Sequence, residues 1–129
     1  MDRSDGGVVV NISSMAGAYY AEGHRHLMPI YAASKAGVLA YTKCLAKSPE
    51  VIKSNIRLVC ACPRGTDTDL LNDPDPARCR DVNAYQKGAR EAGVMSADEV
   101  AAILMSLVED DTNHGKAAAI LGAEKYSYI

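Results

Sequence analysis

Three short apolar runs and two segments with helical spacing alternate along the chain. The first run, residues 8–12 (VVVNI), is rich in β-branched residues, and the runs at 56–62 and 116–121 are similarly apolar. Runs of this length fit strands that are covered on both faces, as in a parallel sheet. Apolar and small residues recur at helical spacing in 30–47 and 97–109. This alternation predicts an α/β fold with a parallel sheet, in the order β-α-β-α-β.

Both predicted helices carry recognisable end signals. Ser48 precedes Pro49, and a residue before proline is biased out of the α region, which ends the first helix there. Ser96 and Glu99 form a capping-box pattern at the start of the second helix. Inside the first helix, Gly37 costs about 1 kcal/mol relative to alanine, and we expect close packing against another backbone to compensate.

Two connections differ from the regular elements. Residues 18–29 lack clean periodicity and are expected to form a loop. The polar stretch at 66–93 is too long for a simple connection in a compact domain, and such stretches often form lids or binding loops. Part of it, near 84–92, has the composition of a helix. We expect a single domain that spans residues 1–129 and carries this long segment.

Composition and charge narrow the class of protein. The net charge is -2, without a long run of Lys or Arg that would indicate a nucleic-acid or membrane-surface site. No apolar stretch approaches the roughly 18 residues of a membrane-spanning helix. Residues 1–7 are polar and lack the apolar region of a signal peptide. We therefore expect a cytoplasmic or organelle-matrix protein that binds neither nucleic acid nor membrane.

The cysteines do not have the spacing of a metal site. Cys44, Cys60, Cys62 and Cys79 contain no C-x-x-C pair, and the histidines are not spaced with them as zinc ligands would be. We predict four free thiols and no metal. Cys60 and Cys62 are two residues apart in a predicted strand, so their side chains share one face of the sheet.

Tyr31 and Lys35 are the residues with the clearest chemical potential. They are one helical turn apart and share a face of the first predicted helix. A phenol ordinarily titrates near pH 10, and a neighbouring ammonium stabilises the phenolate, so such a pair can act as a general acid and base. Many helices carry this spacing by coincidence. Here Ser14 and residues 63–68 follow two parallel strands, and ligands bind at the carboxyl ends of such strands.

Three ordered motifs resemble the short-chain dehydrogenase/reductase family. They are residues 11–17 (NISSMAG), 31–37 (YAASKAG) and 55–63 (NIRLVCACP). The tail at 96–116 is similar to the last helix and strand of that family, and the sequence is similar to its 15-hydroxyprostaglandin dehydrogenase-like members. The resemblance extends over nearly the whole chain. It implies the C-terminal part of a Rossmann-like, doubly wound parallel sheet.

The resemblance implies an NAD(P)-dependent oxidoreductase that interconverts a secondary alcohol and a ketone through a Ser-Tyr-Lys mechanism. Ser14 would hydrogen-bond the substrate oxygen, with Ser13 as the alternative hydroxyl. Tyr31 would transfer the proton, and Lys35 would assist it and bind the nicotinamide ribose. The resemblance also implies a small-molecule substrate. A full-length form would be a homo-oligomer, either a dimer or a tetramer.

The cofactor implied by the resemblance is NAD or NADP. The segment at 66–93 would then form the substrate-binding loop. The residues implied at the cofactor are Tyr31, Lys35, Pro63, Thr66 and Thr68.

The nucleotide-binding half of the family precedes these motifs. It contains a Gly-rich turn after a strand, whose backbone N–H groups face the pyrophosphate. The present sequence contains no such turn, because Gly6 and Gly7 come before a strand. We therefore expect a truncated form that lacks the N-terminal βαβ units and has impaired cofactor binding. The alternative is a non-catalytic interaction module that docks on full-length relatives through residues 30–47.

Two further departures fall within the site. Extra residues around 22–26 lengthen the connection between the serine and tyrosine motifs. A surface insertion without a role is the simpler interpretation, and a changed substrate entrance is the alternative. His24 and His26 in this stretch are interpreted as exposed loop residues. Arg64 replaces the glycine that usually follows the proline, and it could crowd the nicotinamide or reach a phosphate.

Overall fold

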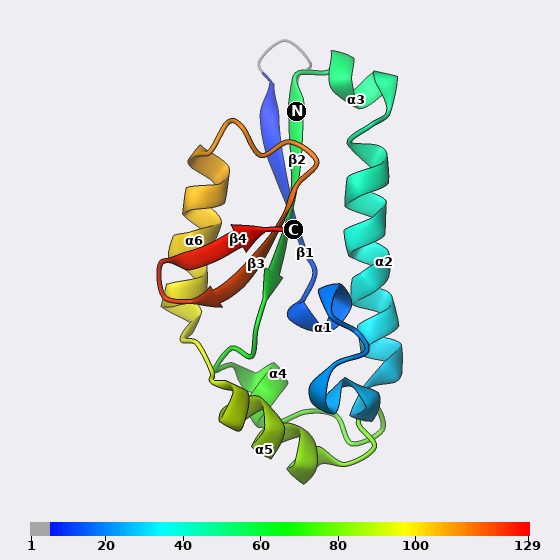
Figure 1. The fold of residues 1–129 in the computed structure, drawn as a ribbon, viewed down its shortest axis with the longest axis vertical. Helices are drawn as coiled ribbons and strands as arrows, with labels where there is room; N and C mark the ends of the chain where they lie inside the picture. Colours follow the sequence, from blue (N-terminus) through cyan, green and yellow to red (C-terminus); the bar gives the residue numbers. More distant parts are fainter. Residues whose placement is uncertain (1–5) are drawn as a thin grey trace.

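The computed structural model describes residues 6–129 as a four-stranded sheet between two helical layers (Figure 1). Most of the polar start, residues 1–5, for which we predict no signal peptide, lies outside the described residues. Within the described part, no helix is both long and apolar enough to span a bilayer. The elements in chain order are β1 (Gly7–Ile12), α1 (Met15–Ala18), the 3-10 helix η1 (Gly23–Leu27), α2 (Pro29–Leu45), α3 (Pro49–Lys53), β2 (Ile56–Pro63), α4 (Asp69–Asn72), α5 (Val82–Ala92), α6 (Ala97–Glu109), β3 (Ala117–Gly122) and β4 (Lys125–Tyr128).

The sheet has the order β1-β2-β3-β4, and its first three strands are parallel as predicted. The fourth strand is antiparallel to β3 and was not predicted. Its sequence, KYSY, is short and alternates exposed and half-buried positions, so it lacks the apolar run that identified the other strands. A tight turn through Glu124, at a positive φ of 53°, leads into it. A three-stranded parallel sheet is therefore only part of the architecture.

Helices cover both faces of the sheet, which explains the apolar character of the strands. Five consecutive residues of β2 are buried, as expected for a strand with no solvent face. Cys60 and Cys62 face the layer formed by α1 and α2, where Val38 packs against them. Ile103 and Leu107 of α6 fill the opposite layer. The four cysteines are free thiols, and the two on β2 share a face, as predicted.

The predicted helix ends are close to the observed ones. The Ser96 hydroxyl accepts a hydrogen bond from the Glu99 amide at 3.2 Å, and the Glu99 carboxylate accepts one from the Ser96 amide at 2.7 Å. This confirms the capping box of α6. The helix α2 ends at Leu45, slightly before the predicted position, because Ser48 accepts from the Val51 amide and begins the short helix α3 instead.

The close backbone contact expected at Gly37 occurs at Gly17 instead. A Cβ atom at Gly17 would lie 2.5 Å from the Lys35 carbonyl carbon and 2.7 Å from the Ala36 amide nitrogen. A Cβ atom at Gly37 would meet nothing within 4 Å, so the prediction of close packing there is wrong. Gly17 therefore allows α1 to lie directly against the backbone of α2.

Candidate active site

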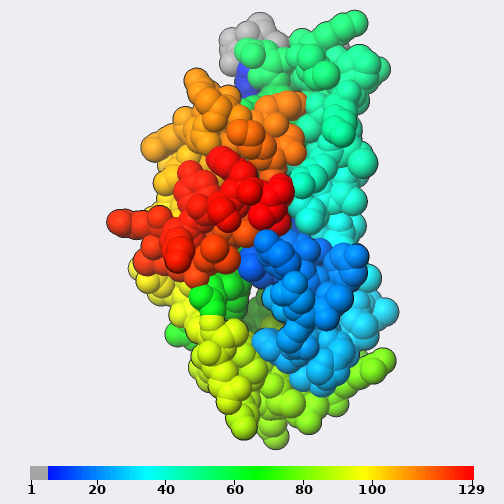
Figure 2. All heavy atoms as spheres, in the orientation of Figure 1, coloured from blue at the N-terminus to red at the C-terminus, as the bar shows by residue number. Residues whose placement is uncertain are grey.

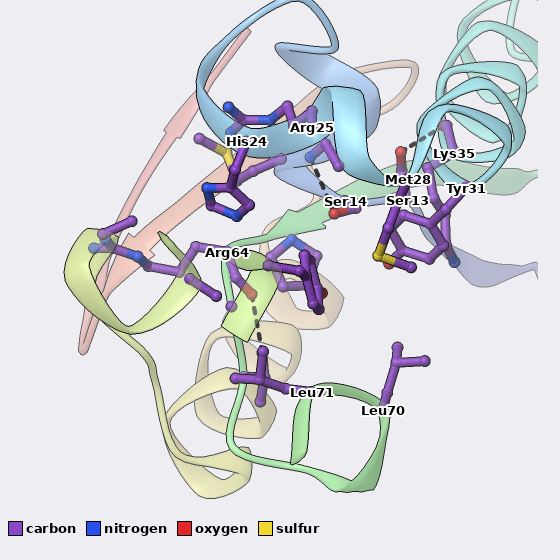
Figure 3. Close-up of a pocket in the computed structure, with 18 of the residues that line it drawn as sticks. Ser13, Ser14, His24, Arg25, Met28, Tyr31, Lys35, Arg64, Leu70 and Leu71 are labelled. Carbon is purple, nitrogen blue, oxygen red and sulfur yellow. Dashed lines mark hydrogen bonds between the residues drawn. The ribbon is translucent and has the colours of Figure 1, made fainter. Parts of the chain in front are cut away.

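A cavity of about 400 Å³ lies where β1 and β2 end. Its hollow opens between the blue atoms that follow β1 and the yellow-green atoms of α5 (Figure 2). Side chains from the ends of both strands, from α2 and from the segment at 66–93 line it (Figure 3). The lining includes every residue predicted for the site: Ser14, Tyr31, Lys35, Pro63, Thr66 and Thr68.

Ser14 begins α1 as its N-cap. Its hydroxyl oxygen accepts a hydrogen bond from the Ala16 amide at 3.0 Å, which satisfies one of the free N–H groups of the helix start (Figure 3). The hydroxyl proton of Ser14 takes no part in this bond. Ser14 can therefore donate to an oxygen in the cavity while it still caps the helix.

The hydroxyl of Ser13 is used in a buried hydrogen bond within the fold. Ser13 is 2% exposed, and its hydroxyl donates to the Lys35 carbonyl at 2.6 Å. This bond joins the end of β1 to the middle of α2 and uses the only proton that the hydroxyl can give. The geometry therefore favours Ser14 over Ser13 as the hydroxyl that acts on a ligand.

Tyr31 and Lys35 lie on one face of α2, as the spacing predicts. The Lys35 ammonium is 5.8 Å from the centre of the Tyr31 ring and donates to the Ile12 carbonyl at 3.0 Å. Both side chains are half-buried in the cavity wall. The phenol and the ammonium are thus close enough to interact electrostatically, and both face the end of β1 (Figure 3).

The segment after β2 is held together at its base. The Met95 amide donates to the Gly65 carbonyl at 2.9 Å, and the Asp67 amide donates to the Met95 carbonyl at 2.8 Å. We call these two bonds the neck of the segment. Between the two sides of the neck lie α4 and α5, so residues 66–93 are not a bare loop, and the helix predicted near 84–92 is observed.

The hydroxyls at the start of this segment turn back on their own backbone. Thr66 donates to the Arg64 carbonyl at 3.1 Å, and Thr68 donates to the Thr66 carbonyl at 3.4 Å. Pro63 ends β2 beside them. The three residues predicted to line the nicotinamide thus follow one another along one edge of the cavity.

The extra residues around 22–26 form the 3-10 helix η1 rather than a loop. The ring of His24 packs edge-on against the ring of Tyr85 of α5, with 5.7 Å between centroids. The Arg80 amide donates to the Leu27 carbonyl at 2.9 Å. This stretch therefore packs against the segment at 66–93 and forms part of the cavity wall, so it is not an isolated surface insertion.

His24 is half-buried, which corrects the expectation of an exposed loop histidine, whereas His26 is exposed as expected. Burial lowers the pKa of His24, and the positive charges of Arg25 and His26 lower it further. Burial also raises the pKa of Tyr85, with a smaller contribution from Tyr31. The cavity therefore holds a second phenol and an imidazole beside the predicted site.

Several polar and large side chains of the lining were not predicted for the site. No periodicity in the sequence shows that residues before α2 and residues of α5 face the same space, because their pairing depends on the tertiary fold. They include His24, Arg25, Met28 and Tyr85.

Arg64 lines the cavity and bonds to the backbone of a neighbouring strand. Its guanidinium donates to the Leu121 carbonyl at the end of β3, at 2.7 Å. Gly93 leaves room for it, because a Cβ atom there would lie 3.0 Å from a guanidinium nitrogen. The side chain thus extends along the cavity wall toward β3 (Figure 3).

The residues present fit one end of a nicotinamide dinucleotide. The hydroxyls of Ser14 and Tyr31 and the ammonium of Lys35 are suited to a ribose and a reacting oxygen. A pyrophosphate usually lies against a Gly-rich turn that opens a helix. The turns after β1 and β2 carry serine, threonine and arginine side chains instead, so these residues fit the nicotinamide and ribose but not the pyrophosphate.

Known proteins with similar sequences include dehydrogenases and reductases. Mouse 15-hydroxyprostaglandin dehydrogenase [NAD(+)] is 30% identical over 116 residues, which are 86% of this chain and 42% of that protein. The 3-oxoacyl-[acyl-carrier-protein] reductase FabG of Chlamydia trachomatis is 32% identical over 117 residues, 88% of this chain and 42% of the reductase. The chain thus spans less than half the length of these relatives.

A solved structure agrees with the sequence matches. L-sorbose reductase from Gluconobacter frateurii, complexed with NADPH and L-sorbose, superimposes with a TM-score of 0.64 at 27% identity. The match covers 95% of this chain and 49% of that one. A model of the family described as short chain dehydrogenase matches residues 1–78, which is more than half of the 129 residues. The chain therefore belongs to the short-chain dehydrogenase/reductase family.

Proposed function

We propose that this chain carries the acid/base residues of an NAD(P)-dependent oxidoreductase that interconverts a secondary alcohol and a ketone. The observation that supports this most directly is the convergence of Ser14, Tyr31 and Lys35 on one cavity, although they come from two elements. A hydroxyl donor, a phenol and an ammonium together can polarise a carbonyl and move a proton.

In this proposal each side chain has a separate role. Ser14 donates a hydrogen bond to the substrate oxygen and holds it near Tyr31. The Tyr31 hydroxyl gives a proton to that oxygen during reduction and takes it back during oxidation. Lys35 stabilises the phenolate form that Tyr31 passes through, since an opposite charge nearby favours ionisation. The nicotinamide, when bound, exchanges a hydride with the substrate carbon.

The cofactor in this proposal is NAD or NADP. The name of the mouse relative specifies NAD(+), and L-sorbose reductase was solved with NADPH, so the relatives include both. Pro63, Thr66 and Thr68 would line the nicotinamide, and Lys35 would exchange its bond to the Ile12 carbonyl for bonds to the ribose. We further propose a cytoplasmic location and a homo-oligomer for the complete protein.

A second candidate function is a non-catalytic interaction module. The observation that favours it is the apolar surface of α2, where Ile30 is 82% exposed and Tyr41 is 61% exposed. These two side chains lie on the same face of the helix, and apolar surface gathered on one face can mark a site for a partner. Such a module needs no proton transfer, so the following experiment separates the two candidates.

Replacing Tyr31→Phe removes the hydroxyl and keeps the ring. In the protein that carries this chain, turnover of a secondary alcohol should fall by about 10²–10⁴-fold, because general acid/base catalysis contributes that much. Initial rates of nicotinamide reduction measure the effect. Tyr41→Phe is the matched control, since Tyr41 lies exposed on the same helix, and it should keep full activity. Retained activity in Tyr31→Phe would contradict the proposal.

A further inference from the structure

The wall of the cavity is cationic. Three of its lining side chains are cationic, namely Arg25, Lys35 and Arg64. His24 also lines it, but its lowered pKa keeps its imidazole neutral. Among the described residues that line it, none is Asp or Glu. Lys35 already has a role in the proposed reaction. The two arginines have none, and their charges fall inside a partly enclosed space where electrostatic interactions are stronger than in bulk water.

Among residues 6–129, no carboxylate forms an ion pair with either arginine. Arg25 donates to the Glu22 backbone carbonyl at 2.7 Å, and Arg64 donates to the Leu121 carbonyl at 2.7 Å. Each carbonyl orients one guanidinium nitrogen but supplies no full negative charge. The described part of the chain has two ion pairs, Arg78–Asp75 and Lys87–Glu91, and both join exposed side chains outside the cavity. Both arginines therefore have charge and donors available for a ligand.

Arg25 has a specific unsatisfied group. Its Nε atom is buried and has no hydrogen-bond partner among the described residues. A buried donor without a partner costs about 1–3 kcal/mol, so native structures rarely leave one unless a ligand or water completes it. The guanidinium presents its N–H groups in a planar fork that matches the two oxygens of a carboxylate.

His24 and Arg64 lie away from the proposed reacting groups. In the close-up, His24 and Arg64 are on one side of the cavity, and Tyr31 and Lys35 are on the other (Figure 3). Apolar side chains complete the wall, including Met15, Met28, Leu70 and Leu71. A ligand that fits this distribution has an anionic group at one end, an apolar body, and a carbinol or carbonyl at the other end.

We propose that the substrate of this site is an anionic amphiphile, a hydroxy or oxo acid whose carboxylate binds Arg25 and Arg64. This rests on the proposed function for the chemistry at the other end of the ligand. The extra residues before α2 thus supply a specificity residue, Arg25, and the unusual residue after the proline, Arg64, supplies a second. A phosphate of the cofactor has similar charge and is the competing source of the anion.

The test measures binding rather than turnover. Calorimetry on the 129-residue chain compares sodium octanoate with 1-octanol, which has the same apolar body and no charge. Octanoate should bind more tightly, and its affinity should fall with added salt. Arg25→Gln should weaken octanoate binding by about tenfold or more, because a charged hydrogen bond contributes about 1.5–3 kcal/mol, and should leave 1-octanol binding unchanged.

The control variant is Arg78→Gln. Arg78 is 82% exposed, forms a surface ion pair and does not line the cavity, so octanoate binding should be unchanged. If Arg25→Gln does not fold, as judged by circular dichroism, Arg25→Lys is used instead. That variant keeps the charge but loses the planar fork, and it should also bind octanoate more weakly.

Two results would overturn the inference. One is equal affinity for octanoate and 1-octanol, or unchanged octanoate binding in both the Arg25 and the Arg64→Gln variants. The other is Arg25-dependent binding of inorganic pyrophosphate without binding of octanoate, which would assign the anion to the cofactor. The Tyr31→Phe variant should still bind octanoate. A failure of the proposed reaction is therefore distinguishable from a failure of this inference.

Discussion

Ser13 and Ser14 are adjacent in the sequence, yet their hydroxyls serve different neighbours. Ser13 gives its proton to the backbone of α2, whereas Ser14 accepts a bond from α1 and keeps its own proton. The sequence identified both as hydroxyls after a buried strand, but only resemblance to the family favoured Ser14. The distinction depends on burial, which arises when α1 packs on α2, and no local pattern encodes it.

Arg25 and His24 line the cavity, although no pattern in the sequence places them there. A short stretch of polar residues between two motifs has the composition of a surface loop, and its sequence contains no periodicity. These residues reach the cavity because α5 folds back against them. That contact is between segments distant in the sequence, as in the bond from the Arg80 amide to the Leu27 carbonyl. Such a long-range pairing could not be predicted from the sequence.

The lowered pKa of His24 predicts a pH dependence of stability. An unfolded histidine titrates near pH 6.5, and burial keeps His24 neutral to lower pH in the folded protein. The unfolded state then binds more protons below about pH 6.5, so folding loses stability as the pH falls. As the pH is lowered from about 7.5 to 5.5, the free energy of unfolding should fall more for the wild-type chain than for His24→Gln. Urea unfolding at each pH measures it.

His26→Gln is the control for this measurement, because His26 is exposed on the same short helix. It should keep most of the pH dependence of the wild-type chain, because burial is the largest cause of the lowered pKa of His24 and the charge of His26 is the smallest. Equal pH dependence in the wild-type and His24→Gln chains would show that burial of this imidazole does not affect stability.

At the scale of elements, the regular strands and long helices were predictable because their patterns are local. Runs of apolar β-branched residues identified β1 and β2, and a capping box identified the start of α6. The elements that were missed are all short: α1, η1, α3, α4 and β4. Two of them, η1 and β4, are stabilised by neighbours. β4 pairs with β3, and its Tyr128 hydroxyl donates to the carboxylate of Asp110 beyond α6.

The contact between α1 and α2 gives a matched pair of glycine substitutions. Gly17→Ala should destabilise the chain by about 1–3 kcal/mol, because the added methyl would overlap the backbone at Lys35 and Ala36. Gly37→Ala should stabilise it by up to about 1 kcal/mol, since the methyl enters open space in a helix interior. Urea unfolding of both variants measures the difference.

The Gly17→Ala variant also tests the geometry of the site. Gly17→Ala should also reduce turnover, because α1 begins at Ser14 and α2 carries Tyr31, so separating the two helices changes their spacing. A Gly17→Ala variant as stable as the wild-type chain would mean that the two helices do not pack as described.

At the scale of the whole molecule, the three layers bring Ser14, Tyr31 and Lys35 to one cavity. In the proposed function, these two hydroxyls and the ammonium bind a nicotinamide ribose and the reacting oxygen. The cavity wall provides no Gly-rich turn for a pyrophosphate among the residues after β1 and β2. The three motifs and the residues that follow β1 and β2 are visible without coordinates, so both parts of this proposal could be stated from the sequence.

The 129-residue chain alone should therefore lack micromolar affinity for NADH. The phosphates of a dinucleotide contribute much of its binding through backbone N–H groups at a helix start, and those groups are not provided here. Calorimetry of NADH with the isolated chain measures this. L-sorbose reductase, which was solved with NADPH, is a positive control for the method with that cofactor. Micromolar binding to the isolated chain would contradict the prediction.

The neck has a consequence for how this site could diversify. Gly65 and Asp67 both bond to Met95, so the chain leaves the sheet and returns at nearly the same point. The residues between them can change in number without moving any strand, since closing a longer loop costs little additional entropy. This segment is therefore interchangeable: a relative's version, joined at the same two bonds, could transfer a new ligand preference to an unchanged sheet.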